Sequence, residues 1–111
     1  VNIYSLDTME YLGVLNYSQE IKSVQGGECL NGTLYLGTND MKRAVYAVDI
    51  ATGTAEKLFD RIAYEYKYIT NFGGEGEDLT VAEIDGEVML CTLQIGVTFT
   101  DATLRGYVLS K

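Results

Sequence analysis

The feature that most restricts the fold of this chain is a phrase that it carries twice. The stretch GGECLNGTLYLGTND covers residues 26–40, and GGEGEDLTVAEIDGEVMLCTLQ covers residues 73–94. Both begin with Gly-Gly-Glu, pass through an apolar run to a turn that contains glycine, and end in alternating residues. Alternation with a period of two predicts β-strands, and Asn-Gly or Asp-Gly between two strands predicts a tight hairpin. The sequence therefore predicts a repeated hairpin, turning at Asn31-Gly32 and again at Asp85-Gly86.

The period of two continues outside the repeated phrase. Proline is absent, so turns depend on Gly, Asn, Asp, Ser and Thr. Only residues 62–69 fit a helical pattern, and their β-branched and aromatic side chains argue against a helix. The predicted fold is all-β and antiparallel. Its expected strands cover residues 1–7, 10–17, 23–30, 33–39, 44–50, 55–62, 77–84, 87–94 and 104–110.

A second pair of phrases shows the larger repeating unit. VNIYSLDTMEYLGVL aligns with RAVYAVDIATGTAEKLF, and LRGYVLS occupies the same place near the end. The segment from Gly27 aligns with that from Gly76. A unit of four short strands and about 40 to 50 residues has the period of a β-propeller blade. We expect one segment of antiparallel four-stranded blades, with the outer strands of one blade in residues 1–22, a complete blade in 23–69 and three strands of a further blade in 70–111.

One stretch resembles a known group of proteins. LYLGTNDMKRAVYAVDIATGTAEKLF is similar to a blade of the quinoprotein-like, NHL-like and lactonase-like propellers, in which Val-Tyr-Ala-x-Asp-x-x-Thr-Gly marks the third strand and its turn. The resemblance covers most of the chain as blade architecture and points to no single family. The chain has no tryptophan, so it lacks the Trp-Asp ending of WD40 blades and the tryptophan docking motif of quinoprotein dehydrogenases. The resemblance implies an extracellular or periplasmic setting, and the absence of tryptophan argues against a quinone cofactor.

Charge and composition exclude several classes of function. The chain has 16 acidic and 8 basic residues and a net charge of −8, which argues against nucleic acid and anionic membranes as partners. Histidine is absent, which excludes Ser-His-Asp and Cys-His catalysis. Cys29 and Cys91 lie in predicted strands, and buried reduced thiols are the expected state. A disulfide between them stays open, because the sequence does not place their Cβ atoms.

The stretch EGEDLTVAEIDGE is dense in carboxylates, which are ligands for Ca²⁺, although it lacks the EF-hand spacing. In lactonase-like propellers a glutamate at the entry to the inner strand can ligate a metal in the central channel. By this resemblance the metal candidates are Glu28 and Glu77. The competing interpretation is that these acids are solvated or cap turns and that no cofactor is bound.

Two further groups of residues have competing interpretations. Asp7 and Asp49 occupy equivalent turns, where aspartate typically accepts hydrogen bonds from its own turn backbone. Tyr64, Tyr66 and Tyr68 alternate, which suits packing on one strand face or a surface on which a ligand stacks.

Two blades do not close a ring, so two apolar faces are left without neighbours. We expect the chain to be a stretch of a longer propeller whose remaining blades are its partners. Assembly with copies of itself and a small sandwich or barrel are the alternatives. The expected function is a non-catalytic binding or interaction scaffold. The alternatives are part of a propeller enzyme, either a lactonase-like metal-dependent hydrolase or a glutaminyl-cyclase-like transferase, and a self-assembling structural module.

Overall fold

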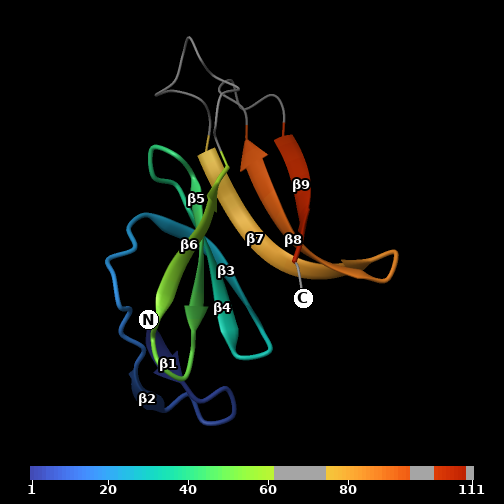
Figure 1. The fold of residues 1–111 in the computed structure, drawn as a ribbon. Helices are drawn as coiled ribbons and strands as arrows, with labels where there is room; N and C mark the ends of the chain where they lie inside the picture. The colour runs from blue at the N-terminus through green and yellow to red at the C-terminus, as the bar shows by residue number, and fades with distance from the viewer. Residues whose placement is uncertain (62–74, 96–101, 110–111) are drawn as a thin grey trace.

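A computed structural model describes residues 1–61, 75–95 and 102–109 of the chain (Figure 1). Every regular element in these residues is a β-strand, which confirms the all-β prediction. The described part has no helix long and apolar enough to cross a membrane. Its strands are β1 (Asn2–Tyr4), β2 (Tyr11–Val14), β3 (Val24–Leu30), β4 (Thr33–Thr38), β5 (Ala44–Asp49), β6 (Ala55–Asp60), β7 (Glu75–Ile84), β8 (Glu87–Ile95) and β9 (Ala102–Val108).

The strands form three antiparallel sheets in chain order. The first is the β1–β2 hairpin, the second is the four-stranded sheet β3-β4-β5-β6, and the third is the three-stranded sheet β7-β8-β9. Figure 1 shows the third sheet beside the second, with the β1–β2 hairpin near the β5–β6 turn. None of these sheets closes into a barrel within the described residues.

Both predicted hairpin turns are confirmed in their backbone geometry. Asn31 and Gly32 have φ angles of 49° and 80°, and Asp85 and Gly86 have 53° and 79°. Positive φ at both central positions is the signature of a type I′ turn, whose twist matches that of the flanking strands. Asparagine, aspartate and glycine tolerate this conformation, so the local sequence determines where each hairpin reverses.

The register of the two hairpins corrects one part of the repeat alignment. Gly27 lies opposite Leu36 in the first hairpin, and Val81 lies opposite Leu90 in the second. Counted from the two turns, the counterpart of Gly27 is therefore Val81, and the alignment of Gly27 with Gly76 is wrong. The reason is length, because β7 has 10 residues and β3 has only 7.

The sheets are held together by two apolar clusters. Leu36 of the second sheet packs with Leu15, Tyr17 and Ile21 from the segment that precedes this sheet. Its counterpart Leu90, which is 0% exposed, packs against the second sheet instead. Burying one such side chain stabilises the fold by about 1.5–3 kcal/mol. The second and third sheets therefore each bury one face against the part of the chain that precedes them. We call this face the front face of the sheet.

The spacing between the second and third sheets differs along their width. Gly26 of β3 lies so close to β7 that a Cβ atom there would be 2.9 Å from the backbone nitrogen of Leu79. Near the other side, the Phe59 and Tyr107 rings separate the sheets, with centroids 4.4 Å apart. The sheets therefore approach most closely where a glycine replaces a side chain.

Candidate functional site

The two metal candidates lie in different surroundings. Glu28 is on β3, where its carboxylate accepts hydrogen bonds from the Thr80 hydroxyl at 3.1 Å and the Cys29 backbone N–H at 3.3 Å. Counted from the turns, the residue of β7 that corresponds to Glu28 is Ala82 rather than Glu77. Glu28 joins β3 to β7, and this contact accounts for its position without a metal.

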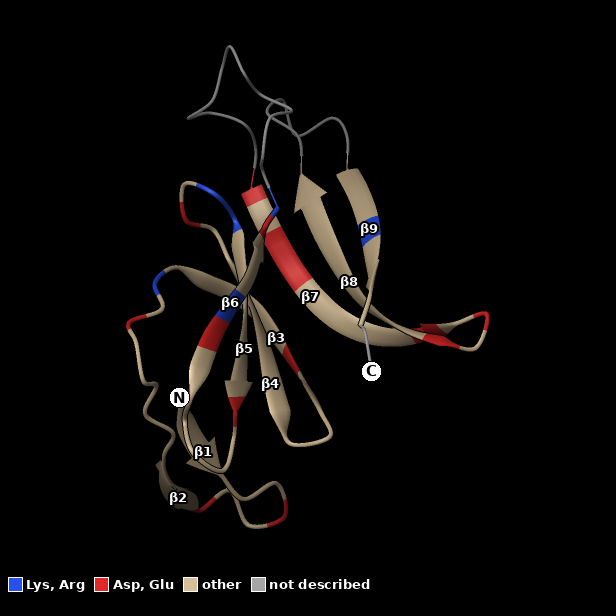
Figure 2. Ribbon diagram, viewed as in Figure 1, with Lys and Arg blue, Asp and Glu red and all other residues tan. Residues whose placement is uncertain are grey.

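Glu77 lies in an irregular step of β7, between Gly76 and Leu79. A hydrogen bond with the Glu75 carboxyl raises the pKa of Glu77, and the charges of Glu75 and Asp78 add to this effect. Figure 2 shows these acids near the start of β7, and a second acidic group at the β7–β8 turn. Within the described residues, no three Cys, Asp or Glu side chains are grouped closely enough to hold a metal ion.

The two cysteines are unpaired and differ in exposure. Cys29 is exposed on β3, so the expectation that it is buried is wrong, whereas Cys91 is buried on β8. The difference arises because Cys29 belongs to an edge strand of its sheet, and Cys91 to the middle strand of the next.

Of the two turn aspartates, the structure supports the expected role for Asp49. Its carboxylate accepts hydrogen bonds from the Thr52 backbone N–H and hydroxyl, both at 2.8 Å. These bonds lower the pKa of Asp49. In the β1–β2 turn the acceptor is the Ser5 hydroxyl, which receives the Thr8 N–H at 3.2 Å, so the prediction for Asp7 is wrong. The tyrosines at 64, 66 and 68 lie outside the described residues.

A buried polar cluster joins the second and third sheets, and sequence reasoning missed it. Arg61 is 5% exposed, and its guanidinium donates to the carbonyls of Thr38 at 2.6 Å and Arg43 at 2.9 Å. Gly76 packs against this guanidinium, and its N–H donates to the Asn39 side chain at 3.0 Å. Burial lowers the pKa of Arg61. An arginine after a strand gives no signal in the sequence that it is buried, because long charged side chains usually stay in water.

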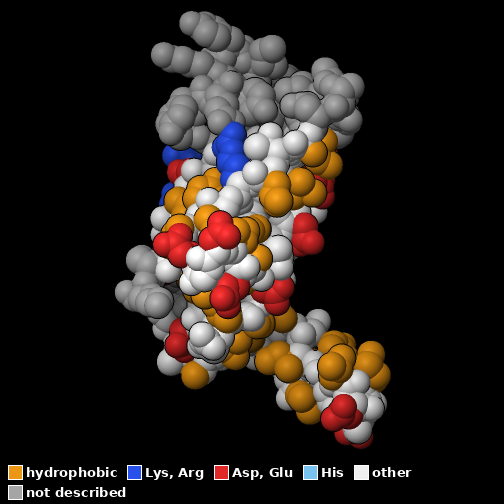
Figure 3. All heavy atoms as spheres, turned by 90° about the vertical axis from the view of Figure 1, so that its right-hand side faces the viewer, with side chains coloured by type: hydrophobic (Ala, Val, Ile, Leu, Met, Phe, Trp, Pro, Cys, Tyr) orange, Lys and Arg blue, Asp and Glu red, His pale blue; other side chains and the backbone are white. Residues whose placement is uncertain are grey.

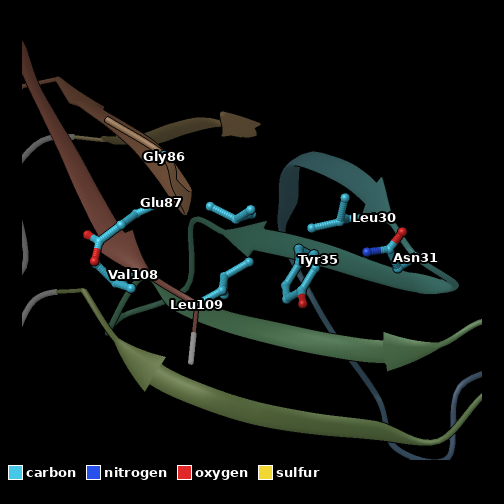
Figure 4. Close-up of a pocket in the computed structure, with 8 residues that line it drawn as sticks. Leu30, Asn31, Tyr35, Gly86, Glu87, Val108 and Leu109 are labelled. Atoms are coloured by element: carbon cyan, nitrogen blue, oxygen red, sulfur yellow. The ribbon is translucent and has the colours of Figure 1, made fainter. Parts of the chain in front are cut away.

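A cleft of about 620 Å³ opens between the two hairpins, and Figure 4 shows the residues that line it. Leu30 and Tyr35 come from the second sheet, and Val88 and Leu109 face them from the third. This volume lies in the range of small-molecule sites. Its polar side chains are Asn31, Tyr35 and Glu87, and in Figure 4 the Glu87 carboxylate points away from Tyr35.

The third sheet also has an open face, which we call its far face because it is opposite the buried front face. It includes Leu104, Val108 and Ile84, which are 70%, 55% and 45% exposed. A hollow of about 200 Å³ on this face is lined in part by Cys91, Leu93 and Leu104. From the alternation of the three strands, the far face comprises Thr80, Ala82, Ile84, Glu87, Met89, Cys91, Leu93, Ile95, Ala102, Leu104, Gly106 and Val108.

No protein family, curated protein or solved structure matches this chain. No function is therefore transferred to it from a relative.

Proposed function

We propose that the chain is a non-catalytic binding scaffold of the β-propeller kind, in which sheets stack front face to far face. The far face of β7-β8-β9 binds a further sheet of the same kind. That sheet belongs either to the remaining blades of a longer protein or to another copy of this chain.

The observation that carries this proposal is the equivalence of two sheet faces. On the second sheet, Tyr35 and Val45 belong to the apolar cluster formed with the third sheet, and Gly37 faces Leu79 of that sheet. Counted from the hairpin turns, the counterparts of Tyr35 and Gly37 on the third sheet are Met89 and Cys91. Cys91 itself is buried, but Val45, which lies opposite Gly37, is 0% exposed, whereas its counterpart Gly106, which lies opposite Cys91, is exposed. A position covered in one repeat is therefore open in the next.

The chemistry of the far face agrees with a protein partner. Of the twelve residues assigned to this face, Glu87 beside the β7–β8 turn is the one charged residue, although the chain as a whole has a net charge of −8. A contiguous, mostly apolar surface marks an interaction site, because its exposure to water is unfavourable. Figure 3, which looks onto the side where β9 lies, shows hydrophobic side chains on this side of the molecule.

The other end of the stack has exposed apolar side chains as well. Tyr4, Tyr11 and Leu12 of the β1–β2 hairpin are 55%, 56% and 64% exposed. Figure 3 shows hydrophobic side chains on the part that protrudes at the bottom, where this hairpin lies. A unit with one apolar surface at each end suits a stack that continues in both directions.

The test is the solution mass of the 111-residue chain, by light scattering on a sizing column, with binding of a hydrophobic dye measured in parallel. A discrete oligomer would show that copies cover the far face, and a dye-binding monomer that the face awaits a further sheet. A compact monomer that binds no dye would overturn the proposal.

A matched pair of variants assigns the response to the far face. Leu104→Lys places a charge on this face, whereas Leu6→Lys changes a residue that is 92% exposed in the β1–β2 turn. We expect Leu104→Lys to reduce oligomerisation or dye binding and Leu6→Lys to leave both closer to wild type. Equal responses would show that the exposed surface elsewhere is responsible.

A further inference from the structure

Three strands of the chain share a position in their sheets and a tyrosine. Tyr46 of β5 lies opposite Leu36, and Tyr107 of β9 lies opposite Leu90, the counterpart of Leu36. The repeat aligns Tyr4 of β1 with the same position. β1, β5 and β9 are therefore equivalent strands.

β1 and β5 are each followed in the chain by a strand that pairs with them antiparallel, and both pairs contain a register shift at the same position. The register of β1 with β2 shifts between Ile3 and Tyr4, and the register of β5 with β6 shifts between Val45 and Tyr46. A bulge that recurs at equivalent positions belongs to the design of the unit. Within the described residues β9 pairs with β8 alone, and Figure 1 shows it at the outer margin of its sheet.

β6 and β9 each lie at the edge of a sheet, but only β6 has the charged side chains that are typical of an edge strand exposed to water. β6 includes Glu56, Lys57 and Asp60, and Lys57 forms an ion pair with Asp60 at 3.1 Å. Charged residues, lysine above all, protect a sheet edge against pairing with another strand. β9 has one charged residue in seven and exposes Leu104 and Val108. An exposed apolar edge strand of this kind is a template for pairing.

We infer that the outer edge of β9 binds an extended polypeptide segment that adds to the sheet as an antiparallel strand. The segment lies opposite residues 105–109, with a register shift between Gly106 and Tyr107. By equivalence with β6, it places small or apolar residues where β6 has Ala55 and Phe59, because these two side chains join the apolar clusters on the two faces of the second sheet.

The source we infer for this segment is a second polypeptide chain, which a peptide added in trans represents. All nine described strands already pair with a neighbour, so none of them is available without leaving its sheet. Main-chain hydrogen bonds give this kind of recognition its affinity, and alternate side chains give it specificity. The inference concerns main-chain pairing at the edge of β9 and not contact with the far face, and a far-face variant separates the two.

The test uses a synthetic peptide with the sequence of residues 54–61, TAEKLFDR, as the probe. The peptide is added to the intact chain, and amide hydrogen exchange is followed at residues 105–109 by NMR. At about 90% occupancy the free form falls to about a tenth, so alternate amides of β9 should exchange roughly tenfold more slowly. Unchanged exchange at β9 under saturating peptide would overturn the inference.

Two N-methylated peptides separate edge pairing from side-chain contact. One is methylated at the amide of Ala55 and the other at that of Glu56, two successive residues that lie outside the register shift. Successive amides of a strand point to opposite sides, so methylation blocks pairing in one peptide and is tolerated in the other. Equal binding of both would contradict edge pairing, as would exchange changes confined to β5, which would mean that the peptide displaces β6.

The far-face variant Leu104→Lys distinguishes this inference from the proposed scaffold function. It should lose association through the far face and still show protection of residues 105–109 by the unmethylated peptide. Loss of peptide protection in this variant alone would assign the peptide to the far face and overturn the edge site.

Discussion

Replacing Gly26 by alanine should destabilise the chain, because the backbones of β3 and β7 meet at this residue. An alanine Cβ would lie 2.9 Å from both the Cα atom of Asp78 and the backbone nitrogen of Leu79. Both of these atoms belong to the backbone of β7, so rotation of a side chain cannot relieve their contact with the added Cβ atom. The two strands must separate by several tenths of an ångström.

The expected cost follows from two opposing effects. Overpacking in a close contact costs about 1–3 kcal/mol. The change from glycine to alanine restricts the unfolded chain, which offsets about 0.4–1 kcal/mol of that cost. The net loss in the free energy of unfolding is therefore about 1–2 kcal/mol. For a chain of this length that loss lowers the midpoint of thermal unfolding by roughly 4 to 8 °C.

Gly106→Ala is the matched control, since a Cβ at Gly106 meets the flexible end of the Met89 side chain at 2.8 Å. Met89 can move away, so this variant should stay within about 0.5 kcal/mol of wild type. Urea and thermal unfolding at one fixed protein concentration measure both variants. A Gly26→Ala chain as stable as the Gly106→Ala chain would refute the close contact between β3 and β7.

Three other predictions concern titration, thiols and metal. Hydrogen bonds from Thr52 lower the pKa of Asp49 below its usual value of 3.8 in the folded chain. The ionised carboxylate therefore stabilises the fold at pH values above the pKa that Asp49 has in the unfolded chain. This stabilisation is lost as the pH falls through the lower pKa of the folded chain. The difference in unfolding free energy between wild type and Asp49→Asn should accordingly shrink on acidification; a constant difference would contradict it. A maleimide should label Cys29 in the folded chain and Cys91 only after unfolding, as followed by mass spectrometry; equal labelling rates would be inconsistent with the described burial. Addition of Ca²⁺ should leave the unfolding midpoints of wild type and Glu77→Gln equally unaffected, whereas a rise that Glu77→Gln abolishes would favour a metal-dependent propeller enzyme.

The sequence predicted most reliably those features that depend on neighbouring residues. Asn31-Gly32 and Asp85-Gly86 specify their own turn geometry, because few other residues accept positive φ at both central positions. The alternation of apolar residues similarly identified the strands. The side chain of Asp49 reaches only to Thr52, so its hydrogen bonds were also predictable from the local sequence.

Features that depend on distant residues were not predictable in this way. The sequence alignment matched the segment from Gly27 with that from Gly76, but register is counted from the turn and the second hairpin is longer. The burial of Arg61 depends on carbonyls at Thr38 and Arg43, which belong to other strands and connections. Glu28 similarly contacts Thr80, a partner far along the chain.

The unequal spacing between the second and third sheets has a geometric consequence. One layer of the stack is thin where Gly26 meets β7, and thick where Phe59 meets Tyr107. A layer that is thinner along one margin is a wedge, and wedges laid one on another turn steadily toward their thin margin. In the stack that we propose, repetition of this unit would give a curved assembly with its glycines on the inside, and the wedge angle would set the number of units.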